Sequence, residues 1–113
     1  MQKLNTVYEL ETNEGDKLQL TLAYRYLYQL RSKHRDQYND FNVIMTKGAK
    51  DFFDNVTILY TAYLCELMAE DGDTAGCMSY DDFMDVLPEM EEVQKAVGML
   101  VAPKKTMASA NLS

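Results

Sequence analysis

The sequence predicts a mostly α fold, in which an N-terminal β-hairpin packs on a bundle of about four helices. Three observations predict it. Leucines near the N-terminus alternate with polar residues, which is the period of a strand. From about residue 23 the apolar residues recur at spacings of three and four, which is the period of a helix. Glycines and prolines then divide the rest of the chain into separate segments.

Residues 4–22 have the pattern of the hairpin. Leu18, Leu20 and Leu22 alternate with polar residues, and the segment from Leu4 to Leu10 alternates in the same way. Residues 13–16 between them, Asn-Glu-Gly-Asp, are types that favour tight turns. Because an isolated hairpin is not stable in water, its leucine face should pack on a helix.

Two long helices are expected next, over residues 23–45 and 49–70. The first has one apolar stripe, which includes His34. The second is apolar over about half of its circumference, which favours a central position in the bundle. Ile58 and Cys65 lie on its far side and predict a second, weaker apolar strip.

The C-terminal part should contain two further helices. Ser79 is a good N-cap for a short helix, because its hydroxyl can accept a hydrogen bond from a main-chain N–H in the first turn. Pro88 is expected to open the last helix and Pro103 to end it. The chain is thus predicted to be a single domain over residues 1–103, followed by a flexible tail over residues 104–113.

The charge balance narrows the possible partners. Lys plus Arg is 11 and Asp plus Glu is 18, so the formal net charge is −7. Such an excess repels phosphate groups, and we therefore expect neither a nucleic-acid nor a membrane partner. The first residues lack the apolar core of a signal peptide, and no window approaches the ~20 apolar residues of a membrane-spanning helix. The expected location is the cytoplasm.

Few residues suit catalysis. His34 lies in an apolar stripe, which favours a hydrogen-bonded, partly buried residue over a general base. Cys65 has no adjacent cation to lower its pKa, so a structural thiol is favoured. These two residues and Cys77 are too few for a structural zinc site. Glycine-rich nucleotide-binding motifs are absent from the sequence. We therefore predict a protein that is not an enzyme and has no catalytic residues, no cofactor and no metal.

Residues 71–83 carry an alternative interpretation, a degenerate calcium loop of the EF-hand type. Gly76 falls at the sharp turn of such a loop, but Ala75 replaces one ligand. The ligands in this alternative would be Asp71, Asp73, Ser79 and Asp82. A polar loop followed by a capped helix explains the same residues, and we favour that explanation.

Tyr24 and Tyr28 are candidates for partner binding. Both lie off the apolar stripe of the first long helix, on the side that also holds Arg31 and Arg35. Tyrosine beside arginine is typical of protein interfaces, because each offers a large contact area with a polar end. The alternative is that both rings lie along the hairpin or a neighbouring helix. Ile58 and Cys65, on the second strip, are the other candidates.

The order of these segments resembles the tail assembly chaperones of long-tailed bacteriophages and prophages of Gram-positive bacteria. The similarity covers nearly all of residues 3–105. The runs that carry it are KLNTVYELETNEGDKLQLTLAYRYLYQLRSKH, KGAKDFFDNVTILYTAYLCELMAED, MSYDDFMDVLPEM and VAPKK.

The resemblance implies a role in virion assembly. Proteins of this family bind the tape measure protein in the host cell cytoplasm, keep it soluble while the tail tube assembles around it, and are absent from the mature virion. It therefore implies the tape measure protein as the partner and the tail tube protein as a second candidate. We also expect self-association, through the strip that holds Ile58 and Cys65.

Overall fold

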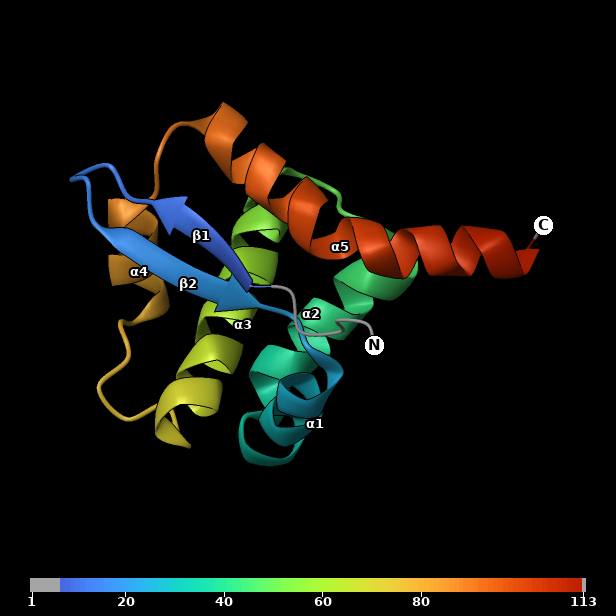
Figure 1. Cartoon of the computed structure of the whole chain (residues 1–113), viewed down its shortest axis with the longest axis horizontal. Coiled ribbons are helices and arrows are strands. Elements are labelled where there is room, and N and C mark those ends of the chain that lie inside the picture. The colour runs from blue at the N-terminus through green and yellow to red at the C-terminus, as the bar shows by residue number, and fades with distance from the viewer. Residues whose placement is uncertain (1–6, 113) are drawn as a thin grey trace.

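The computed structural model describes the backbone of residues 7–112 and the side chains of residues 7–102. Its elements, labelled in Figure 1, confirm a mostly α fold with an N-terminal hairpin. The predicted start of the first strand at Leu4 lies outside the described residues. In chain order the elements are β1 (Val7–Glu11), β2 (Lys17–Thr21), α1 (Tyr24–Lys33), α2 (Arg35–Lys47), α3 (Phe52–Asp71), α4 (Tyr80–Val86) and α5 (Met90–Leu112).

Helix α3 lies at the centre of the molecule, as its wide apolar surface predicts. It contacts β2 and all four other described helices. Figure 1 shows the hairpin crossing α3, with α4 on the left of α3 in this view and α1 and α2 on the right. The residues of α3 that are buried lie all around the helix: Val56, Ile58, Leu59, Tyr60, Thr61, Ala62, Tyr63, Leu64, Cys65 and Met68.

The hairpin packs its leucine face on α3. Its strands are antiparallel, with Leu10 opposite Leu18 and Tyr8 opposite Leu20. Leu10 and Leu20 are buried in the core, and β2 is the strand in contact with α3. This is the helix packing that an otherwise unstable hairpin requires.

The turn of the hairpin is held by hydrogen bonds within the turn and by hydrogen bonds to the end of α4. The Thr12 hydroxyl accepts hydrogen bonds from the N–H groups of Glu14 and Asp16. Asn13 donates its main-chain N–H to the carbonyl oxygen of Val86 at 3.0 Å, and its side-chain amide to that of Asp85 at 2.8 Å. These are carbonyls at the C-terminal end of α4, where helix carbonyls lack partners within the helix. The turn therefore caps α4.

The single helix predicted over residues 23–45 is wrong, because the chain bends at His34 and forms α1 and α2. His34 has φ −137° and ψ 68°, which are not helical values. A straight helix over 23 residues would be about 35 Å long. Only a bend lets Leu30 on α1 and Phe41 on α2 both reach the core around α3.

Most of the predicted helix ends are confirmed. Gly48 follows α2 with φ 91°, a conformation that favours glycine. The Ser79 hydroxyl accepts a hydrogen bond from the Asp82 N–H at 3.1 Å and caps α4. The last helix begins two residues later than predicted, because the N–H of Val93 donates to the Glu89 carbonyl and Pro88 lies just outside the helix.

Pro103 does not end α5, which continues to Leu112. A proline inside a helix removes one N–H donor and its ring crowds the carbonyl four residues earlier, which destabilises or kinks a helix but does not always end it. The predicted helix end at this proline is wrong. The flexibility of residues 104–113 stays a prediction.

An aromatic cluster joins α3 to α4 and to the loop before it. The Tyr60 ring meets those of Tyr80 and Phe83 edge to face, with centroids 5.3 and 5.2 Å apart. Tyr63 also packs on Phe83, at 5.2 Å. Offset and edge-to-face contacts of this kind add to the stabilisation from burial alone. This cluster holds α4 against α3.

Candidate groove between helices α1 and α2

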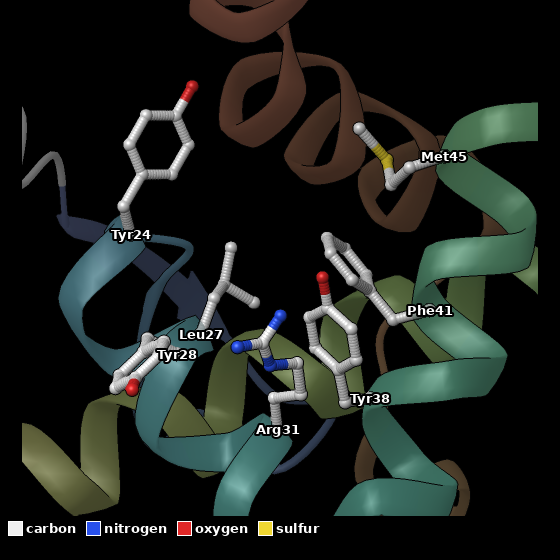
Figure 2. A pocket seen from close by; sticks show the side chains of 7 residues that line it. All are labelled: Tyr24, Leu27, Tyr28, Arg31, Tyr38, Phe41 and Met45. Carbon is white, nitrogen blue, oxygen red and sulfur yellow. The ribbon is translucent and has the colours of Figure 1, made fainter.

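The bend at His34 leaves an apolar groove between α1 and α2, shown in Figure 2. Its volume is about 280 Å³. Leu27 and Phe41 form buried parts of its lining, one from each helix. The complete lining is Tyr24, Leu27, Tyr28, Arg31, Tyr38, Phe41 and Met45.

Tyr24 and Tyr28 stand at the α1 side of this groove. Tyr24 is 57% and Tyr28 63% exposed, so much of each residue is accessible to a partner. Tyr38 on α2 packs against Phe41 with ring centroids 6.4 Å apart. The groove thus has exposed aromatic side chains at one edge and a core-like lining below them.

Arg31 supplies the positive charge of the groove. Its guanidinium carbon lies 5.2 Å from the centroid of the Tyr28 ring, a cation–π distance. Within residues 7–102, no carboxylate oxygen lies within 4 Å of the Arg31 guanidinium. The predicted neighbourhood of tyrosine and arginine is therefore present at Tyr28 and Arg31.

The sequence did not reveal which residues form the opposite edge. Tyr38, Phe41 and Met45 belong to the stripe that was expected to be core, and Phe41 is indeed buried. Tyr38 and Met45 are only half-buried, because the bend turns α2 away from α1. These residues could have been predicted only from a break in the helix, and the sequence has no glycine or proline at His34 to indicate one.

Ile58 and Cys65 are not surface residues, and their prediction as partner-binding residues is wrong. Ile58 is 4% exposed and Cys65 is fully buried, and both belong to the core cluster. The strip they form is covered within the same chain, because α3 is surrounded by the hairpin and the other helices. The expected surface for self-association is therefore absent at these two positions.

The calcium-ligand set is not brought together. Asp73 accepts a hydrogen bond from the Ala75 N–H at 3.0 Å, and Ser79 caps α4. Asp71 ends α3, whereas Asp82 lies within α4. In the described part of the chain, no three His, Cys, Asp or Glu side chains are grouped closely enough to hold a metal ion. The residues of this loop order the connection between two helices.

His34, Cys65 and Cys77 lie in different environments. The Nε2 atom of His34 lies 2.9 Å from the Thr74 hydroxyl oxygen, so the imidazole is hydrogen-bonded as expected, although it is exposed and not partly buried. Cys65 is buried and Cys77 is half-buried, and neither forms a disulfide. Cys77 contacts the Tyr60 hydroxyl. Burial, with this contact as a second cause, raises the pKa of Tyr60 to about 12.

A second apolar groove lies where α3 and α5 begin. Phe53 and Met90 are exposed there, at 59% and 55%. The residues that line this second groove are adjacent in sequence to Asp51, Glu89 and Glu91. The second groove therefore has acidic neighbours, whereas the groove between α1 and α2 contains the basic Arg31. None of the helices in the described residues contains an apolar run long enough to cross a bilayer.

Comparison with protein-family models, with curated proteins and with solved structures finds no match to this chain.

Proposed function

We propose that this chain is a phage tail assembly chaperone that binds the tape measure protein and keeps it soluble during assembly of the tail tube. The observation that carries the proposal is the groove between α1 and α2, with Tyr24 and Tyr28 exposed at its edge. Tyrosines in this position provide contact area at a protein interface. The resemblance of the sequence supplies the identity of the partner.

The physical demands of the role agree with the composition. A tape measure protein is long and helical, and its apolar surface aggregates until the tube encloses it. A groove lined by apolar side chains can cover one helical segment at a time. The formal charge of −7 makes coated complexes repel one another, which favours solubility. In this proposal the protein acts without catalysis, in the host cell cytoplasm, and is absent from the mature virion.

Co-expression tests the proposal. The tape measure protein encoded nearby is produced with and without this chain, and the soluble and co-purified fractions are measured. We expect soluble tape measure protein only when this chain is present. The paired substitution Tyr24→Ala and Tyr28→Ala should abolish co-purification.

The matched control uses exposed apolar side chains away from the groove. Phe53→Ala together with Met99→Ala removes two residues that are about as exposed as the tyrosines, at 59% and 55%. This control should leave co-purification unchanged. Equal aggregation of the tape measure protein with and without this chain would refute the proposed function, and equal loss in both paired variants would refute the role of the groove.

A further inference from the structure

The positive charges of this acidic protein are unevenly placed. No Asp or Glu occurs between Asp16 and Asp36. The same interval contains five cations, Lys17, Arg25, Arg31, Lys33 and Arg35. Three of them lie on α1. A chain of formal charge −7 therefore presents a local basic surface on the helix that forms one side of the groove.

Arg31 is the cation of this surface that lines the groove. It packs over Tyr28, and it has no carboxylate partner within residues 7–102. At 100° per residue, Arg25 lies about 120° and Lys33 about 160° around α1 from Arg31, and neither lines the groove. Arg31 alone on α1 is thus placed to meet a charge that a bound segment brings to the groove.

We propose that the groove binds an amphipathic helix whose apolar stripe is bordered by Asp or Glu, and that Arg31 pairs with one of these carboxylates. This inference rests on the proposed function and specifies the kind of tape measure segment that is bound. The apolar lining at Leu27, Phe41 and Met45 takes the apolar stripe, and the charge of Arg31 sets its orientation.

Two other occupants are less suited to the groove. A nucleic acid would gain from Arg31 and from stacking on Tyr28, but it would be repelled by the overall charge of −7 and would leave the apolar lining uncovered. A second copy of this chain carries the same formal charge of −7, so two copies repel one another overall. Both are therefore included as outcomes of the experiment.

Three synthetic helical peptides test the inference. They share one stripe of leucines at positions i, i+3, i+4 and i+7, and their flanking positions are all Glu, all Gln or all Lys. Binding to the full chain is measured by fluorescence anisotropy. We expect the Glu peptide to bind about 1.5- to 5-fold more tightly than the Gln peptide, as a partly exposed charge pair allows. The difference should shrink as salt is added.

Two matched substitutions assign the effect to one residue. Arg31→Gln should make the Glu and Gln peptides bind equally, whereas Lys33→Gln, the same charge change on the opposite side of α1, should keep the preference. Arg31→Glu should invert the preference in favour of the Lys peptide. Thermal melting of each variant checks that the fold is retained, and Arg31 is exposed, so its replacement should leave the melting temperature unchanged.

The outcomes separate this inference from the proposed function. Equal binding of all three peptides, or an unchanged preference in Arg31→Gln, overturns the inference while a soluble tape measure complex still supports the chaperone. No peptide binding also overturns the inference if the tape measure protein stays soluble with this chain. Failure of both assays refutes the proposed function as well. Displacement of the Glu peptide by a single-stranded oligonucleotide, or self-association that depends on Arg31, assigns the groove to another occupant.

Discussion

Tyr60 donates its hydroxyl hydrogen to the carbonyl oxygen of Met78 across 2.7 Å. The neighbouring Tyr63 hydroxyl accepts a hydrogen bond from the N–H of the same residue at 2.9 Å. Both main-chain groups of Met78 are therefore paired with side chains of α3. Ser79, which caps α4, follows directly in the chain. This arrangement places the start of α4 relative to the central helix.

The double substitution Tyr60→Phe and Tyr63→Phe should destabilise the protein. It keeps the aromatic cluster but leaves the main chain of Met78 without its two side-chain partners. Each lost hydrogen bond is expected to cost about 1 kcal/mol of unfolding free energy. Urea denaturation followed by circular dichroism measures the change. Tyr26→Phe is the control, since the Tyr26 hydroxyl has no hydrogen-bond partner within residues 7–102. A loss of equal size in that control would contradict the assignment.

Ile58→Asp should unfold the protein and not merely weaken an interface. The side chain is 4% exposed, so an aspartate there is buried without a partner, and we expect a loss of about 3 kcal/mol or more. Val43→Asp is the matched control, because Val43 is exposed on α2 and the change should stay within about 0.5 kcal/mol. Thermal melting of both variants makes the comparison. A folded Ile58→Asp variant with unchanged stability would restore this position as a surface candidate.

Glu66 should make stability depend on pH near neutrality. Burial, followed by the hydrogen bond and the negative charge of Glu70, raises the pKa of Glu66 from 4.5 to about 7. The folded chain therefore holds this proton more tightly than the unfolded chain. The resulting stabilisation is complete below the unfolded pKa, near 4.5, and is lost as the pH rises through about 7.

Glu66→Gln tests this dependence. At pH 8 the variant should be more stable than the parent by about 1 kcal/mol, because solvent screens the partly exposed carboxylate and reduces its effect. Near pH 4.5 the two proteins should be equally stable. Urea denaturation at a series of pH values gives both curves. Glu91→Gln, on the exposed start of α5, should follow the parent. A Glu66→Gln variant that is less stable than the parent at pH 8 would show that the carboxylate is favourable there.

Calcium should leave the melting temperature unchanged. Asp73 and Ser79 are already hydrogen-bonded within the loop, and the proposed ligands are not grouped. Differential scanning fluorimetry with and without millimolar calcium measures this. A concentration-dependent rise in melting temperature that Asp71→Ala abolishes, and that Asp36→Ala does not, would restore the calcium interpretation.

Much of the fold follows from local patterns. The hairpin, the central helix and the Ser79 cap each depend on periodicity or on one capping residue, and all three are present. The bend at His34 could not be predicted in this way, because no proline or glycine marks it. It arises from packing, since α1 and α2 must both bury residues against α3.

The candidate groove was only half predictable for the same reason. Tyr24 and Tyr28 leave the apolar stripe, so the sequence made them candidates for exposure without excluding contact with a neighbouring element. Tyr38 and Met45 lie on the stripe, and only the bend uncovers them. Ile58 and Cys65 show the opposite error, because a helix surrounded on all sides buries even its weaker apolar strip.

The hydrogen bonds from Asn13 to the end of α4 have a consequence for biosynthesis. The hairpin is made first, yet its turn needs the carbonyls of residues 85 and 86, and β1 also contacts α5. While the ribosome has not passed these residues, the leucine face of the nascent hairpin lacks part of its cover. We therefore expect folding to finish only after α5 has been synthesised, so that a chain terminated before α5 is a substrate for cellular proteases.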